Sequence, residues 1–135
     1  DFYAWTQAQA EALRQRGRSG NALDYDNLAE EVGDMGKSEV DAVESLALNI
    51  LVHLIKIECS LREEPKAHWR AEIVAFRKGW RRKLSPSIRT ILAADLESLH
   101  VDAFEIVHAQ FAAEEPNALP LDETRRWILT DVLGE

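Results

Sequence analysis

Hydrophobic residues recur along this chain at spacings of three and four, which is the repeat of one face of an α-helix. The clearest stripe has spacings of four, three, four and four, and it consists of Trp69, Ile73, Phe76, Trp80 and Leu84. Similar stripes occupy most of the remaining sequence. The pattern predicts helices over about 2–16, 26–62, 67–84, 86–115 and, more briefly, 122–133.

Glycines and capping residues mark the boundaries of the first two helices. Gly17 and Gly20 are expected to end the first helix, and Asp24 or Asp26 to cap the second by accepting from its free amides. Gly33 and Gly36 follow in the second helix. Because glycine is a poor helix former, we expect a break or bend over 33–37. Ser38 and Asp41 have the spacing of a capping box for a restarted helix.

Prolines and caps define the later boundaries. Pro65 is expected in a turn after the second helix, and Ser85-Pro86 combines a cap with proline at the first helical position. Asp122 is expected to cap the last helix. The elements together predict an all-α fold, a four-helix core bundle with a short C-terminal helix, in a single domain over residues 1–135.

Composition agrees with a soluble helical protein. The chain is 46% hydrophobic, an ordinary share for a globular core. Leu46 to Ile57, the most apolar stretch, is interrupted by polar residues and is too short to cross a bilayer. The single cysteine, Cys59, excludes an internal disulfide and fits a reducing cytoplasm. Because the chain begins at Asp1 without methionine, a signal peptide is neither seen nor excluded.

Charge is unevenly distributed. The net charge of −8 argues against a general nucleic-acid binder. The segment Asp24–Glu44, hereafter the acidic segment, carries eight acids and Lys37 as its one base. The segment Lys66–Arg89, hereafter the basic segment, carries eight bases and Glu72 as its one acid. One small domain therefore presents two strongly charged segments of opposite sign.

Several motifs, taken in order, resemble a known family. They are Asp1-Phe-Tyr-Ala-Trp5 with Gln9-Ala10 and Leu13, Asp26-Asn-Leu-Ala-Glu-Glu-Val32 with Gly36 and Ser38-Glu39, Leu51-Val-His-Leu-Ile-Lys56, Trp69 with Ile73 and Arg77, and Ser85-Pro-Ser-Ile-Arg89. On these residues the chain resembles the bacterial family called domain of unknown function 29. The resemblance implies a helical fold and a bacterial, cytosolic setting. It implies no activity.

His53 is the most unusual candidate residue, because it lies at the centre of an apolar helical stripe, one turn before Lys56. Glu39 projects onto the same stripe several turns earlier. A buried polar ring must find a partner, since an unpaired one costs about 1–3 kcal/mol. One hypothesis is a general base or ligand contact. The other is a core histidine bonded to a carboxylate, an amide or a backbone carbonyl.

Glu30 and Glu31, with Asp34, form the principal acidic candidate. They resemble half of the Glu-Glu-x-x-Glu pattern by which all-α nucleotide pyrophosphatases hold magnesium. The second acidic pair that such enzymes need has no counterpart in register. Acids near a helix start also stabilise the helix dipole without a ligand. No set of ligands has the spacing of a zinc or di-iron site, so no metal, cofactor or catalytic residue is predicted.

The basic segment contains a ridge formed by Arg70, Arg77 and Arg81 beside the aromatic stripe. Such a ridge suits phosphate, an acidic protein or nucleic acid. Alternatively, the arginine stems cover the stripe, or the ridge pairs with the acidic segment within the molecule or across a dimer. Among the aromatic residues, Trp69 is expected mainly in the core, and Trp5, near an end of the chain, is expected to touch a partner or ligand.

These observations lead to three functional hypotheses. The first is a non-enzymatic interaction or scaffold domain that self-associates through charged or aromatic helix faces. The second is a small ligand-binding or magnesium-dependent nucleotide-hydrolase-like bundle that uses Glu30, Glu31 and His53. The third is an anion or nucleic-acid contact through the basic segment. The sequence identifies no substrate, and no membrane partner is expected.

Overall fold

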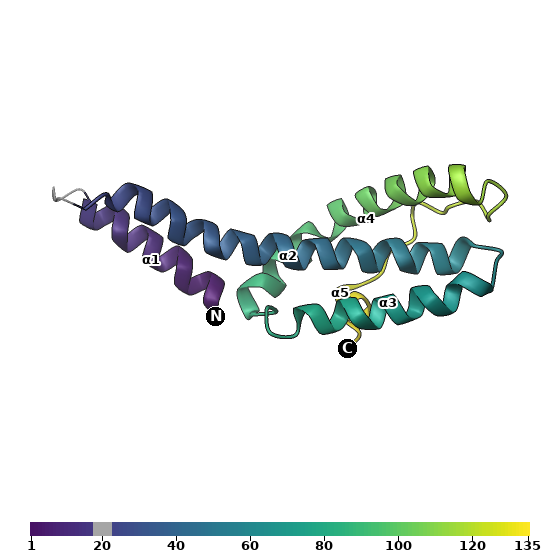
Figure 1. Ribbon diagram of the computed structural model, residues 1–135, viewed down its shortest axis with the longest axis horizontal. Coiled ribbons are helices and arrows are strands. Elements are labelled where there is room, and N and C mark those ends of the chain that lie inside the picture. The colour runs from purple at the N-terminus through teal and green to yellow at the C-terminus, as the bar shows by residue number, and fades with distance from the viewer. Residues whose placement is uncertain (18–22) are drawn as a thin grey trace.

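The computed structural model describes residues 1–17 and 23–135, and within these ranges every regular element is a helix (Figure 1). The helices are α1 (Phe2–Gly17), α2 (Tyr25–Cys59), α3 (Glu64–Trp80), α4 (Pro86–Glu114) and α5 (Leu129–Leu133). The predicted all-α class, with four long helices and a short one, is confirmed. Gly20, expected to help end the first helix, lies outside the described residues.

The helix α2 is 35 residues long and organises the molecule. Along its N-terminal half it packs against α1, and along its C-terminal half it packs against α3 and α4 (Figure 1). We call α1 with residues 25–40 the hairpin, and residues 41–135 the body. The hairpin extends from one end of the thicker body (Figure 1). The other three long helices are thus distributed along α2 rather than side by side at one level.

The expected break at Gly33 and Gly36 is wrong, because α2 continues without interruption through both residues. Ser38 lies within the helix, so it does not cap a restarted one. The glycines instead leave room for α1 to pack against α2. A Cβ atom on Gly36 would lie 2.1 Å from Oγ1 of Thr6. Glycine therefore allows the two helices to approach closely at this point.

Three other helix ends differ from the prediction. The helix α2 ends at Cys59 rather than near residue 62, because Ser60 is in an extended conformation. Pro65 belongs to the first turn of α3 rather than to a turn before it, so α3 begins earlier than expected. Its last residue is Trp80.

The last helix is much shorter than the predicted 122–133. The Asp122 carboxylate accepts from the backbone amide and hydroxyl of Thr124, at 3.0 and 2.6 Å, which closes a turn rather than starting a helix. Only Leu129–Leu133 is helical. Two predicted caps do form. Asp24 accepts from the amide of Asn27, and Ser85 accepts from the amide of Ile88. No helix in the described ranges is long and apolar enough to span a membrane.

The main hydrophobic core lies in the body. It is built from large side chains of α2, α3, α4 and the C-terminal segment, including Ile50, Leu51, Ile55, Trp69, Ile73, Trp80, Leu92, Phe104, Phe111 and Trp127. The aromatic stripe of α3 supplies three of them, as its spacing predicted. This core fixes the positions from which the candidate functional side chains project.

Candidate functional site

The fully buried residues of the hairpin all have small side chains. They are Thr6 and Ala10 of α1, and Ala29, Gly33 and Gly36 of α2. The Nε2 amide of Gln7 donates to the carbonyl of Gly33 across the contact, at 3.1 Å. Small residues let two helices pack at short range, but they remove little apolar surface from water.

Four large apolar side chains of the hairpin are exposed. The exposed fractions are 45% for Phe2, 53% for Trp5, 43% for Leu28 and 52% for Met35. The rings of Phe2 and Trp5 stack on each other, with centroids 6.0 Å apart. Residues 2–10 of α1 include no charged side chain. An exposed, contiguous apolar patch of this kind is typical of an interaction surface.

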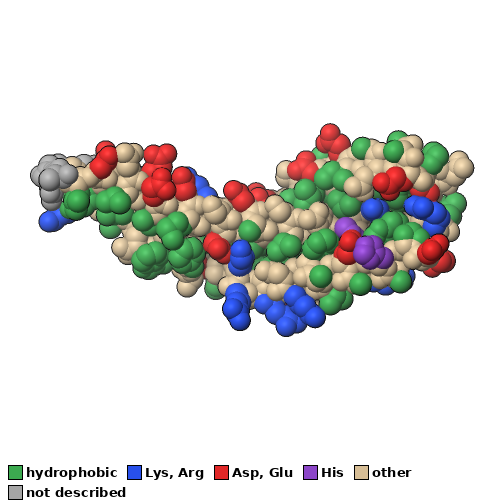
Figure 2. Space-filling view, in the orientation of Figure 1, with side chains coloured by type: hydrophobic (Ala, Val, Ile, Leu, Met, Phe, Trp, Pro, Cys, Tyr) green, Lys and Arg blue, Asp and Glu red, His purple; other side chains and the backbone are tan. Residues whose placement is uncertain are grey.

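Helical spacing places these side chains on one side of the hairpin. At 3.6 residues per turn, Phe2, Trp5 and Ala12 lie on one flank of α1, and Leu28, Val32 and Met35 on one flank of α2. Because the two helices are antiparallel, both flanks face the same direction. We call these six residues the hairpin face. Figure 2 shows hydrophobic side chains gathered along α1 and acidic side chains along the opposite edge of α2.

The acidic candidates lie on different sides of α2. Glu30, Glu31 and Asp34 are exposed; Glu30 and Asp34 lie away from the hairpin face, whereas Glu31 borders it, one turn from Leu28 and from Met35. His53 lies 22 residues after Glu31 on the same continuous helix, which corresponds to about 33 Å. A single small-molecule site using Glu30, Glu31 and His53 is therefore wrong. In the described ranges, no group of three His, Cys, Asp or Glu side chains has the arrangement of a metal site.

His53 is held between α2 and α3. Its Nδ1 lies 2.7 Å from the carbonyl oxygen of Asn49, and its Nε2 contacts the carboxylate of Glu72. The other oxygen of that carboxylate lies 3.0 Å from Nε2 of His68. The ring of His53 also meets the edge of Phe76. Both ring nitrogens of His53 therefore have partners within the protein.

The partners of His53 determine the direction of its hydrogen bonds. A backbone carbonyl and a carboxylate only accept, so a ring nitrogen of His53 bonds to either of them as the donor. The bond from His53 and the charge of the two histidines lower the pKa of Glu72 from its usual range. The contact between His53 and Glu72 therefore joins α2 to α3. Sequence reasoning missed His68 and Glu72, although their spacing of four on one helix was the available signal.

Lys56 and Trp69 form a second contact between α2 and α3. Both residues are buried, and the Nζ atom of Lys56 lies 4.6 Å from the centroid of the Trp69 ring. The ring face attracts the cation and compensates in part for its burial. These two candidate residues thus lie in the body core rather than on an open surface.

The basic ridge is divided between two environments. Arg70 and Arg81 are exposed. Arg77 is half-buried and donates to the carbonyl oxygens of Asp131 and Val132, at 2.7 and 3.1 Å. Burial lowers the pKa of Arg77 from its usual value. Arg77 thus joins the ridge to the C-terminal segment.

The acidic and basic segments are scarcely paired within the molecule. Over residues 1–17 and 23–135, their one mutual ion pair joins Nζ of Lys83 to a carboxylate oxygen of Glu39, at 3.9 Å. The remaining members lie on different parts of the surface, as the separate red and blue regions of Figure 2 show. Extensive internal pairing of the two segments is therefore wrong for this part of the chain.

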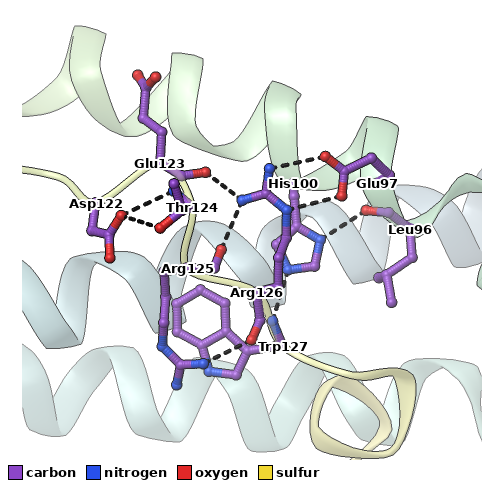
Figure 3. Close-up of polar contacts among 9 residues, drawn as sticks. All are labelled: Leu96, Glu97, His100, Asp122, Glu123, Thr124, Arg125, Arg126 and Trp127. Carbon is purple, nitrogen blue, oxygen red and sulfur yellow. Dashed lines mark hydrogen bonds and ion pairs between the residues drawn. The ribbon is translucent and has the colours of Figure 1, made fainter.

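The C-terminal segment is fastened to the body through polar contacts (Figure 3). His100 is fully buried, its Nδ1 donates to the carbonyl of Leu96 at 2.8 Å, and its Nε2 accepts from the amide of Trp127 at 3.0 Å. Burial lowers the pKa of His100, which favours this neutral tautomer. Arg126 makes two bonds to Glu97. The arrangement explains why a histidine occupies a core position of α4.

Comparison with known proteins identifies the family. The chain matches the model described as domain of unknown function DUF29 over residues 1–134, so it belongs to this family. A comparison with curated proteins gave no match. Among solved structures, the chain is similar to an alpha-helical protein of unknown function from Rhodospirillum rubrum. The two share 27% identity with a TM-score of 0.86, and the match covers 100% of this chain and 87% of the other.

Proposed function

For this member of the family, we propose a non-enzymatic interaction domain that self-associates through the hairpin face. Two hairpins pack face to face and form a four-helix bundle, from which the two bodies extend. The occupant of the hairpin face is thus a second copy of the same chain. The cysteine content and the bacterial source of the similar structure support a bacterial, cytoplasmic setting.

One observation carries the proposal: the hairpin buries small residues between its helices and exposes four large apolar side chains. Phe2, Trp5, Leu28 and Met35 are each at least 43% exposed, while Gly33, Gly36 and Ala10 are buried. An amphipathic helix pair of this kind is half of a four-helix bundle. Burying a large apolar side chain stabilises an assembly by about 1.5–3 kcal/mol.

Charge favours a second copy over an oppositely charged partner at this face. The six residues of the hairpin face carry no formal charge, so the apolar contact itself brings no like charges together. Glu30 and Asp34, on other sides of α2, and Glu31, at the edge of the face, repel a second acidic copy that approaches elsewhere. Repulsion between the acidic surfaces and apolar contact between the hairpin faces together favour pairing through the hairpin face. A two-fold axis through the face makes the contact self-complementary.

Light scattering after size exclusion, over a concentration series, tests this proposal. We expect the wild-type chain to form dimers, and Trp5→Glu to be monomeric with unchanged helical circular dichroism. Ile128→Glu is the matched control, because Ile128 is 64% exposed on the body. It should leave the dimer intact. A wild-type chain that stays monomeric at every concentration overturns the proposal, as does an equal loss of dimer in both variants.

A further inference from the structure

A basic cleft lies between α3 and the turn that follows α5. It encloses about 370 Å³ and is lined by four cationic side chains, Arg77, Lys78, Arg81 and Arg89. Val74 and Leu84, which are exposed and half-buried respectively, supply apolar surface beside them. The cleft lies on the body, away from the hairpin face. In Figure 2, lysine and arginine side chains gather along the C-terminal end of α3.

Arg77 is fixed at the wall of the cleft by the end of α5. Its guanidinium uses Nε and Nη2 to bind the carbonyl oxygens of Val132 and Asp131. Gly134 packs against it in the left-handed conformation, with φ of 77°. A Cβ atom at Gly134 would lie 2.8 Å from Nε of Arg77, so the backbone closes tightly over the arginine. Arg77 is therefore a preorganised part of the wall.

Arg89 shows that the cleft accepts an anionic group. Its Nη1 donates to one carboxylate oxygen of Glu135 at 3.0 Å, and its Nη2 contacts the other oxygen. The bonds from Arg89 lower the pKa of Glu135, so this side chain is a carboxylate. Glu135 is the one acid among the residues that line the cleft.

The cleft carries more positive charge than the Glu135 carboxylate neutralises. Over the described ranges, Lys78 and Arg81 form no ion pair, and both are exposed. Four cations thus face one carboxylate. A phosphate group carries more charge than a carboxylate and offers more acceptor oxygens, so it fits the surplus better than a second carboxylate does.

We propose that this cleft binds the phosphate group of a small phosphorylated ligand. Lys78, Arg81 and Arg89 bind the phosphate oxygens beside the fixed Arg77, and the apolar surface contacts the rest of the ligand. The Glu135 carboxylate binds Arg89 when the cleft is empty, and the phosphate displaces this carboxylate. The side chain of Glu135 is thus an internal competitor for the site.

Calorimetric titration with inorganic pyrophosphate, at constant ionic strength, tests the proposal. We expect saturable binding of one pyrophosphate per chain, weakened about tenfold in Arg81→Ala, because a charged hydrogen bond contributes about 1.5 kcal/mol or more. Arg70→Ala is the matched control, since Arg70 is exposed on the same helix and does not line the cleft. The affinity of the Arg70→Ala variant for pyrophosphate should equal that of the wild-type chain.

The competitor role of Glu135 has its own test. Glu135→Gln should bind pyrophosphate several-fold more tightly, whereas Asp131→Asn, an equal charge change on a nearby residue outside the cleft, should not. An equal gain in both variants overturns the proposal in favour of general electrostatics. Absence of saturable binding overturns it too, as does equal weakening by Arg70→Ala and Arg81→Ala. A single-stranded oligonucleotide that binds tightly and requires Arg70 would indicate a surface for polyanions instead.

The inference is independent of self-association. The monomeric variant Trp5→Glu should bind pyrophosphate with wild-type affinity, because the cleft and the hairpin face share no residue. Failure of the dimer and failure of the anion site are therefore separately observable.

Discussion

The hairpin and the body differ in the size of the side chains that α2 buries in each, although α2 belongs to both. In the body, α2 contributes Ile50, Leu51 and Ile55 to a core that also contains tryptophan and phenylalanine. In the hairpin, it contributes alanine and glycine to the contact with α1. Interhelical distance follows the size of the side chains between two helices. The body thus encloses the large side chains of its core, whereas the hairpin has no buried large side chain and leaves Phe2, Trp5, Leu28 and Met35 exposed.

This difference determines how the folding free energy is distributed between the two regions. Hydrophobic stabilisation scales with the apolar area that is removed from water, so the body holds most of the folding free energy. The hairpin has a small interior and exposed large side chains, and we expect it to open more readily than the body. Covering the hairpin face with a second copy supplies the burial that the isolated hairpin lacks.

The largest predicted effect is in the body. Ile50→Ala removes a fully buried side chain from the main core and should lower the free energy of unfolding by about 3–4 kcal/mol. Urea denaturation followed by circular dichroism measures this loss. A loss below about 1 kcal/mol would mean that the body core does not dominate stability.

A smaller effect is predicted at the closest contact in the hairpin. Gly36→Ala places a methyl group against Thr6, and overpacking of this kind costs about 2 kcal/mol. Because the damage is local, hydrogen exchange should accelerate in α1 and remain unchanged in α3. Gly79→Ala is the control in the body, where a Cβ atom would lie 3.3 Å from Leu46. Equal effects of the two changes would contradict the close-approach role of Gly36.

A pH effect is predicted at the contact between α2 and α4. Burial, with the nearby carboxylate of Asp95, raises the pKa of Glu44 to about 7. The folded state therefore binds this proton more tightly than the unfolded state does. The resulting stabilisation is complete below the ordinary pKa of about 4.5 and is lost as pH rises through about 7.

Glu44→Gln tests this assignment by removing the titration. At pH 8 it should raise the unfolding free energy by ~1 kcal/mol, because the half-buried carboxylate no longer has to be charged. At pH 5 the melting temperature should be nearly unchanged. Equal shifts at both pH values would remove Glu44 as the source of the pH dependence.

The smallest effect on the monomer is predicted for Trp5→Ala. Trp5 is exposed, so the unfolding free energy of the monomer should change by less than about 0.5 kcal/mol. The dissociation constant of the dimer should nevertheless rise tenfold or more, as expected for an aromatic hot-spot residue in an interface. Sedimentation equilibrium measures this rise. A large loss of monomer stability would place Trp5 in an intramolecular core instead.

Periodicity in the sequence was sufficient for the helices and for much of the body core. The stripe from Trp69 to Trp80 packs inward, as its spacing predicted. Gly33 and Gly36 were misread because helix propensity describes a chain in isolation, whereas here the neighbouring α1 determines which residue fits. The contact of His53 with Glu72 was not predictable either, since it depends on the relative rotation of α2 and α3.

The hairpin face illustrates the same limit. A stripe that contains Leu28, Val32 and Met35 has the same pattern as a core stripe. The structure alone shows that the small residues of α2 face α1 and the large ones face outward. Sequence reasoning selected Trp5 as a contact residue, and its role in self-association stays a prediction.

Isotope-filtered NMR on a mixture of labelled and unlabelled chains tests self-association through the hairpin face most directly. We expect intermolecular contacts from the Trp5 indole to Leu28 and Met35 of the other copy. Under dimeric conditions, intermolecular contacts from Val101 or Ile128 of the body, without any from Trp5, would contradict it.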